Sequence, residues 1–329
     1  MALPPADQAL ADGVRRRERR AIAKAITLLE STRADHRVRA DALLNALLPS
    51  TGHAMRLGIS GVPGVGKSTF IEALGLFLIE RGHRVAVLTV DPSSSVSGGS
   101  ILGDKTRMER LSVNDAAYIR PSPSAGTLGG VAEKTREAML VCEAAGFDVV
   151  IVETVGVGQS ETAVSSMTDM FVLLQLPNAG DDLQAIKKGV MELADLVVIN
   201  KADLDPDAAT RAQATITSAL RVFAFHGHAG HWTPRVMQIS ALRSHGIDDF
   251  WQQVEDFHAR RRATGDFDSR RRQQALAWMW DIVQARLQAD FKHHPAVRHA
   301  LHDTLRDVAE ARIAPSSAAH ALLELFERQ

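Results

Sequence analysis

Short apolar runs and amphipathic stretches alternate along the central part of the chain. From Met55 to about Val254, runs of mostly aliphatic residues are followed by stretches in which apolar residues recur every three or four positions. The first pattern predicts buried strands, and the second predicts helices. The first predicted strand begins at Met55. The others span Arg84–Val90, Tyr118–Arg120, Phe147–Glu153, Met170–Leu176, Leu196–Ile199 and Val236–Ile239. Such alternation predicts an α/β fold with a mostly parallel sheet and helices on both faces.

Both flanks of this region have helical patterns without strands. Residues 1–14 show no clear pattern and are expected to fray, whereas Arg15 to about Leu48 carries two apolar stripes at helical spacing. Near the C-terminus, an amphipathic helix around Trp278 and Trp280 precedes two further helical stretches. Packing on the central domain is one interpretation of that helix, but the tail has more apolar surface than a lone helical hairpin buries. The predicted parts are a helical extension (1–54), an α/β domain (55–262) and a helical arm (263–329).

Composition and charge narrow the possible functions. The net charge is −1 with a pI of about 6.9, and the single cysteine, Cys142, excludes an internal disulfide and a Cys-based metal cluster. Acidic residues soon balance the charged run Arg15–Arg20, so it reads as a solvated helix face and not as a nucleic-acid arm. With only 5% aromatic residues, stacking platforms for nucleic acid are not expected. No apolar run has the length of a membrane span, so we expect a soluble, cytoplasmic protein with no nucleic-acid or membrane partner.

The stretch after the first predicted strand carries a phosphate-binding signature. Residues 61–68 read GVPGVGKS and fill the pattern G-x-x-x-x-G-K-[ST] between a strand and a helical stretch. Glycines there let backbone N–H groups surround phosphate oxygens, and the helix N-terminus adds its positive end. We expect Lys67 to reach the β- and γ-phosphates and the Ser68 hydroxyl to ligate Mg²⁺, which defines a P-loop NTPase. The predicted phosphate-binding residues are Gly61, Val62, Pro63, Gly64, Val65, Gly66, Lys67, Ser68 and Thr69.

Two stretches farther along predict that the base is guanine. Asn200, Lys201 and Asp203 form an N-K-x-D arrangement directly after a predicted strand. In this arrangement a carboxylate accepts hydrogen bonds from the guanine N1–H and exocyclic amine, which adenine cannot supply. The stem of Lys201 is expected to lie on the ring face. The second stretch, Ser240-Ala241-Leu242, ends the next strand, where small GTPases keep a backbone amide for guanine O6.

The stretch Glu153-Thr154-Val155-Gly156 occupies the place where GTPases usually carry D-x-x-G. Glutamate replaces the usual aspartate, and its longer carboxylate still reaches Mg²⁺ through water. Gly156 is expected to offer its N–H to the γ-phosphate. The predicted ligands are therefore GTP or GDP with Mg²⁺.

Several of these stretches together resemble the MeaB family of bacterial GTPases. The resemblance rests on GVPGVGKST, VDPSSSVSGGSILGDKTRM, IVETVGVGQSE, LPNAGDDLQAIKKGVMELAD and NKAD, and it runs from about Arg15 to the C-terminus. The family is related to the human protein behind one form of methylmalonic aciduria and to bacterial proteins once called ArgK. The resemblance implies a homodimeric GTPase chaperone that gates adenosylcobalamin loading and protects methylmalonyl-CoA mutase. It further implies that residues 263–329 are a dimerisation arm.

The same resemblance implies roles for particular residues. Asp91 and Asp104 look like switch I acids near Mg²⁺, so the implied metal-binding set is Ser68, Asp91, Asp104 and Glu153. Residues 153–161 look like switch II. Residues 177–188 look like a third switch, although from the sequence alone an ordinary strand-to-helix connection fits that stretch nearly as well.

More than one residue is a candidate for orienting the attacking water. Val157 stands where Ras-like proteins carry glutamine, and no arginine finger is evident. Resemblance to the wider class that contains the signal-recognition GTPases implies that Asp91 orients the water. The alternative role for Asp91 is to start a turn before Pro92. Gln159 is a lesser candidate for orienting the water. The expected catalytic residues are Lys67, Asp91 and Glu153. Intrinsic hydrolysis should be slow and should rise when a partner completes the site.

Two other function classes stay open. His226, His228 and His231 have metal-like spacing, and related GTPases insert nickel, so a metal-insertion GTPase is the main alternative. A solvated loop is the simpler interpretation of these histidines. A P-loop kinase is the other class, which the N-K-A-D stretch disfavours because such kinases more often use ATP.

Overall fold

The computed structural model describes residues 3–90, 108–121, 128–154, 160–177, 188–224 and 232–327. The chain separates into two compact units, Met1–Arg271 and Arg272–Gln329. The division into three parts that the sequence indicates stays a prediction.

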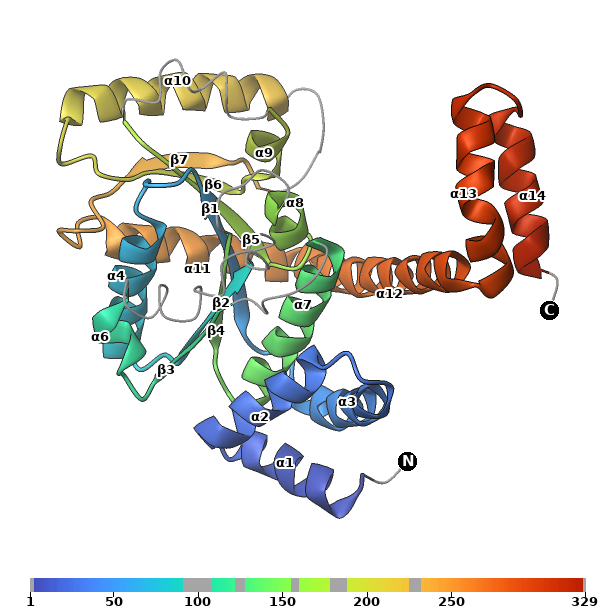
Figure 1. Ribbon diagram of the computed structural model, residues 1–329. Coiled ribbons are helices and arrows are strands. Elements are labelled where there is room, and N and C mark those ends of the chain that lie inside the picture. Colours follow the sequence, from blue (N-terminus) through green and yellow to red (C-terminus); the bar gives the residue numbers. More distant parts are fainter. Residues whose placement is uncertain are drawn as a thin grey trace. The chain divides into compact units, whose positions relative to one another are not determined.

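A parallel sheet of seven strands forms the centre of the first unit (Figure 1). The strands are β1 (Met55–Gly61), β2 (Val85–Val90), β3 (Ala117–Arg120), β4 (Val149–Thr154), β5 (Met170–Gln175), β6 (Leu196–Ile199) and β7 (Arg235–Gln238). Their order is β3-β2-β4-β1-β5-β6-β7, and every neighbouring pair is parallel. The predicted α/β class is confirmed, and all seven predicted strands are present. Because β1 lies centrally, the loop that follows it emerges at the middle of the sheet edge, where open parallel sheets bind ligands.

Helices cover both faces of the sheet. One face packs against α7 (Leu128–Ala144), α8 (Ser160–Ser165), α9 (Lys188–Leu193) and α10 (Pro206–Ala224). The other face packs against α4 (Lys67–Glu80), α6 (Glu109–Ser112) and α11 (Ile247–Ala263). Successive strand residues point to opposite faces, so strands buried on both sides are apolar throughout. No helix in the described parts of the chain combines the length and apolar character needed to span a bilayer.

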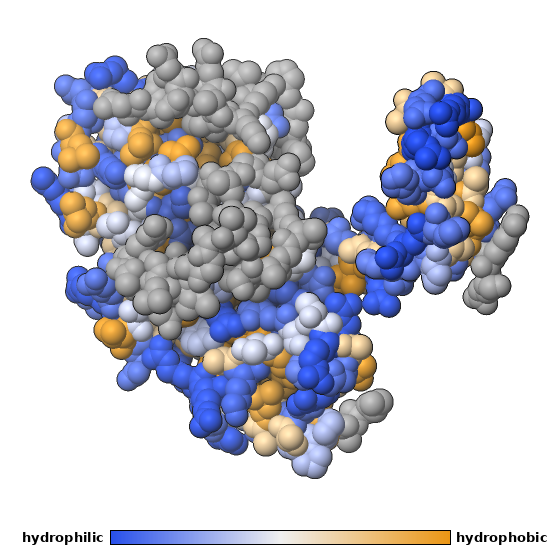
Figure 2. All heavy atoms as spheres, viewed as in Figure 1, coloured by the Kyte–Doolittle hydropathy of each residue, from blue (hydrophilic) through white to orange (hydrophobic). Residues whose placement is uncertain are grey.

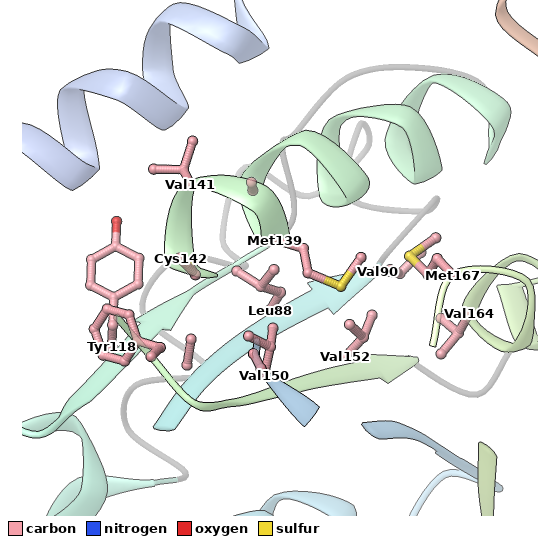
Figure 3. Close-up of a cluster of buried hydrophobic side chains, with 14 of the residues drawn as sticks. Leu88, Val90, Tyr118, Met139, Val141, Cys142, Val150, Val152, Val164 and Met167 are labelled. Atoms are coloured by element: carbon pink, nitrogen blue, oxygen red, sulfur yellow. The ribbon is translucent and has the colours of Figure 1, made fainter. Parts of the chain in front are cut away.

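Figure 3 shows the core between α7 and the strands β2 and β4. Met139 and Cys142 on α7 contribute to the same buried cluster as Leu88, Val150 and Val152 on the strands. Burial raises the pKa of the Cys142 thiol above its ordinary value, which keeps it protonated. This cysteine is therefore a packing residue and an unreactive one.

The first unit also contains three N-terminal helices, α1 (Pro5–Arg15), α2 (Arg19–Glu30) and α3 (Ala34–Leu47), followed by a 3₁₀ turn at Leu48–Ser50. The expectation that residues 1–14 fray is wrong, since α1 is helical and buries Ala11 and Val14. Asp7 on α1 is only 1% exposed and pairs with both Nε and Nη2 of Arg39 on α3, at 3.0 and 2.7 Å. This hydrogen-bonded pair holds the pKa of Asp7 below its usual range and fixes α1 in place.

Arg271 ties the last residues of the first unit to the start of two strands. Its guanidinium donates to both carboxylate oxygens of Asp169, at 2.8 and 2.7 Å, and to the carbonyls of Gly52 and Ala54, at 2.7 and 2.6 Å. Asp169 also accepts from the backbone N–H of Arg56, at 2.8 Å. Arg271 is 13% exposed and Asp169 is 2% exposed, so the pair is largely shielded from water. We call this group the Arg271 clasp.

The second unit continues α12 (Asp266–His293) and adds α13 (Pro295–Ala309) and α14 (Pro315–Glu327). Phe291 and Phe326 meet edge to face with ring centroids 5.4 Å apart, and Val297 and Ala318 are the buried apolar residues among those described in this unit. Hydrophobic patches are therefore visible on its surface in Figure 2. The exposed large hydrophobic residues of this unit are Leu276, Met279, Trp280, Ile282, Val283, Leu287, Leu305 and Leu323.

Candidate nucleotide site

The loop between β1 and α4 has the backbone that the phosphate-binding signature predicts. Gly64 and Gly66 have φ of +80° and +95°, in the left-handed region that glycine favours. A Cβ on Gly66 would lie 2.7 Å from Nδ2 of Asn200, so a side chain there would displace the neighbouring loop. Lys67 is the first residue of α4 and is buried, with its Nζ donating to the carbonyl of Gly61 at 2.7 Å. Ser68 and Thr69 follow in the first turn of α4 and are half-buried, whereas Val62 and Pro63 are exposed and Val65 is buried.

Asn200 joins three loops at the carboxyl edge of the sheet. Its Nδ2 donates to the carbonyl of Val65 at 2.9 Å. Its Oδ1 accepts from the backbone N–H groups of Lys201 and Ala241, at 2.8 and 3.0 Å. Asn200 is 1% exposed, and its bonds to Val65 and Ala241 form out of water, where leaving a polar group unpaired is costly. The structure thus brings the phosphate loop, the N-K-x-D stretch and the Ser240–Leu242 stretch together.

Lys201 and Asp203 line the outer part of this arrangement. Lys201 has φ of +59°, and its Nζ donates to the carbonyl of Gly64 at 2.8 Å, so its aliphatic stem extends toward the phosphate loop. A hydrogen bond from Ser240 is the main reason that the pKa of Asp203 lies below its ordinary value, and the charge of Arg243 acts in the same direction. Asp203 is therefore an ionised acceptor at neutral pH. Ala241 is buried, and Leu242 is exposed.

Arg243 is a residue of this site that the sequence analysis did not single out. Its Nε lies 3.2 Å from Oδ2 of Asp203, on a side chain that is 71% exposed. A cation directly after the Ser240–Leu242 stretch was the available signal in the sequence. The pair places a positive charge against the carboxylate expected to read the base.

Glu153 lies near the carboxyl end of β4, on the face of the sheet that α4 covers. The strand alternation fixes this side, because Ile151 belongs to the core beneath α4 and Glu153 is two residues farther along. Its partner in the neighbouring strand is Thr89, whose buried hydroxyl has no hydrogen-bond partner among the described residues. Beside it, the Thr154 hydroxyl donates to Oγ of Ser60 at 2.8 Å, which ties the end of β4 to the end of β1. An unsatisfied hydroxyl and a carboxylate on the phosphate-loop side fit a hydrated cation bound there.

Several predicted residues lie outside the described ranges. They are Asp91, Asp104, Val157, Gln159 and Gly156, together with residues 178–187 of the third switch and the histidines at 226, 228 and 231. Their roles stay predictions. Within the described ranges, no group of three or more His, Cys, Asp and Glu residues is placed to hold a metal ion.

The fold and the joined loops define a P-loop GTPase, and comparisons with known proteins give the family. Residues 22–296 match the family model described as Methylmalonyl Co-A mutase-associated GTPase MeaB. A Caulobacter vibrioides protein named Putative GTPase is 56% identical over 309 residues, which are 94% of each chain. The chain belongs to the MeaB family, and it is a GTPase of that family.

Other relatives agree with this assignment. The Escherichia coli protein named GTPase ArgK is 45% identical over 97% of both chains. A mouse protein named Methylmalonic aciduria type A homolog, mitochondrial, is 46% identical over 96% of this chain and 78% of its own. Among solved structures, the crystal structure of LAO/AO transport system kinase has a TM-score of 0.79 and 38% identity, and the match covers 99% of this chain and 100% of that one.

Proposed function

We propose that this GTPase binds GTP and GDP with Mg²⁺ at the loops that Asn200 joins, and that it hydrolyses GTP slowly. The observation that carries this proposal is the set of three hydrogen bonds formed by the buried Asn200 side chain. They preorganise the phosphate loop and the base-reading loops, so little ordering has to accompany nucleotide binding. In this assignment Asp203 and the Ala241 N–H read guanine, and Lys201 covers the ring.

Within that site, the residues of β1, α4 and β4 supply the phosphate contacts. Lys67 exchanges its bonds to the Gly61 and Val62 carbonyls for the β- and γ-phosphates, so its charge is already held close to where it acts. Ser68 and Glu153 are the described residues that would hold Mg²⁺, with Asp91 and Asp104 as the proposed further acids. The cation would neutralise charge on the phosphates and fix their orientation.

We further propose that the nucleotide state controls a chaperone function toward methylmalonyl-CoA mutase, gating adenosylcobalamin loading and protecting the enzyme from inactivation. Two findings support this proposal: the matched family is described as mutase-associated, and the mouse relative is named a methylmalonic aciduria type A homolog. Switching of this kind requires that GTP and GDP favour different conformations to different extents.

The test is cofactor transfer and inactivation of the mutase in the presence of the GTPase. We expect GDP and a non-hydrolysable GTP analogue to give different rates of adenosylcobalamin loading, and we expect the GTPase to slow inactivation during turnover. Equal loading and equal inactivation with and without the GTPase, under both nucleotides, would refute the chaperone proposal while leaving nucleotide binding intact.

We also propose that the second unit forms a homodimer interface. Leu276, Trp280, Val283 and Leu287 follow the spacing i, i+4, i+7 and i+11, which places them along one face of α12. All four are exposed, and the described part of the unit buries little apolar surface of its own. The same apolar stripe on a second copy of the chain would cover this face and remove both stripes from water.

The expected result for the pair Leu276→Asp and Leu287→Asp is a monomer that still binds GDP, since the site residues all lie in the first unit. Sedimentation velocity of the full-length chain and the variant measures this change. The pair Asp281→Ala and Arg286→Ala on the same helix serves as the control and should leave the assembly state unchanged. A wild-type chain that sediments as a monomer at micromolar concentration would contradict the dimer.

A further inference from the structure

Arg17 has a backbone conformation that is costly for its residue type. It follows α1, where its N–H donates to the carbonyl of Val14 at 2.8 Å, and the N–H of Glu18 donates to the carbonyl of Gly13 at 3.0 Å. This pattern is a Schellman C-cap, in which glycine is favoured at the left-handed position. Arg17 occupies that position with φ of +67°. Strain of this kind persists at places where the side chain has a use.

The Arg17 side chain is directed toward the turn before β4. A Cβ built on Gly146 would lie 3.1 Å from both Nε and Nη2 of Arg17, so the absence of a side chain at Gly146 leaves room for the guanidinium. Gly146 itself has φ of +76°. The corner after α1 and the turn after α7 therefore meet through an arginine and a glycine.

Arg84 brings a second guanidinium to this place. It stands just before β2, with its Cζ 5.4 Å from the ring centroid of Phe147, the residue after Gly146. Its Nε is buried and has no hydrogen-bond partner among the described residues. Burial and the nearby charge of Arg17 both lower the pKa of Arg84 from its ordinary value.

The carboxylates near these arginines bond to groups other than the two guanidiniums. Glu18 pairs with Arg16 at 2.9 Å. Asp148 accepts from the backbone N–H of Arg84 at 2.7 Å and lies 3.0 Å from Nδ1 of His83. No ion pair to a carboxylate is formed by Arg17 or Arg84 within the described residues. The negative charge of Asp148 acts on Arg84 too, but it offsets the repulsion from Arg17 only in part.

We propose that Arg17 and Arg84 form a binding site for a phosphate group at the edge of the sheet opposite the nucleotide site. The strands β2 and β4 begin beside it, whereas the phosphate loop follows the end of β1 in the same parallel sheet. Two guanidiniums match a dianion in charge, and their forked N–H groups match phosphate oxygens in geometry. A bound phosphate accepts from the forked N–H groups of the two guanidiniums and relieves the repulsion between the two arginines.

The experiment is a phosphate titration of the full-length protein. The chain is first saturated with Mg²⁺ and a non-hydrolysable GTP analogue, so that phosphate cannot enter the P-loop, and ionic strength is kept constant with chloride. We expect inorganic phosphate to raise the unfolding temperature of the wild type by ~2 °C or more. Arg17→Gly should unfold at a higher temperature than the wild type without phosphate, because glycine relieves the strained φ, and it should lose the response to phosphate.

Arg84→Gln, which leaves the backbone of the corner unchanged, should also lose the response, and Arg20→Gln is the matched control that should keep it. Affinity for the GTP analogue should be the same in all four proteins, which separates this site from the nucleotide site. The proposal is overturned if phosphate leaves the wild type unchanged, or if Arg17→Gly and Arg84→Gln respond as the wild type does.

Discussion

Asp203→Asn is expected to lower the affinity for GTP by about 100-fold or more and to raise the affinity for xanthosine triphosphate. The carboxylate of Asp203 is ionised and accepts hydrogen bonds, which matches the two N–H donors of guanine. An asparagine amide offers a donor in place of one acceptor, so it repels the guanine edge and matches the extra carbonyl of xanthine. Fluorescence titration with both nucleotides measures the exchange of preference.

Asp207→Asn is the matched control for this substitution. Asp207 is an exposed acid in the first turn of α10, close in the chain but without contact to the phosphate loop, so its change should leave both affinities as they were. Unaltered GTP affinity in Asp203→Asn would remove this residue from the base site. The loss of the Arg243 pair contributes little to the result, because the Arg243 side chain is 71% exposed and an ion pair with so exposed a partner adds about 1 kcal/mol or less.

Arg271→Ala is expected to reduce the free energy of unfolding of the first unit by about 3 kcal/mol. The substitution removes four hydrogen bonds and leaves the buried Asp169 without its cation. Breaking a buried pair from one side is costly because the remaining charge stays out of water. Urea unfolding at a fixed nucleotide concentration, followed by circular dichroism, measures the change.

Two neighbouring variants sharpen this measurement. Arg272→Ala alters the adjacent exposed arginine and should unfold at the same urea concentration as the wild type. Arg271→Lys keeps the charge but cannot make four directed bonds, so its free energy of unfolding should lie between that of Arg271→Ala and that of the wild type. If Arg271→Ala unfolds at the same urea concentration as the wild type, the Arg271 clasp contributes nothing to stability.

The features that were predictable from the sequence depend on residues close together in the chain. Strands such as β6 are continuous apolar runs, and the phosphate loop and N-K-x-D stretch have fixed spacing because the ligand's shape demands it. The helix α1 was not predicted because a tertiary contact holds it: Asp7 accepts a hydrogen bond from Arg39, which lies 32 residues away in the chain.

The Arg271 clasp and the Arg17–Arg84 pair show the same limitation more strongly. Arg271 contacts carbonyls 217 and 219 residues earlier in the chain, and nothing in its local sequence distinguishes it from Arg270 or Arg272. In the base site, the pairing of Arg243 with Asp203 depends on the meeting of two loops. Contacts that arise only from the folded topology carry no local pattern from which to predict them.

The three bonds of Asn200 also have a consequence for the order in which the protein matures during synthesis. Val65 leaves the ribosome long before Asn200 and Ala241, with which its loop is joined. At ordinary translation rates of about 5 to 20 residues per second, the wait lasts roughly 10 to 35 s. Strand β1 also lacks its partners β4 and β5 for part of that time, so a nascent chain exposes an unpaired apolar strand. Recognition of the guanine base cannot assist folding during this interval, because the loop that contains Ala241 is the last of the three loops to be made.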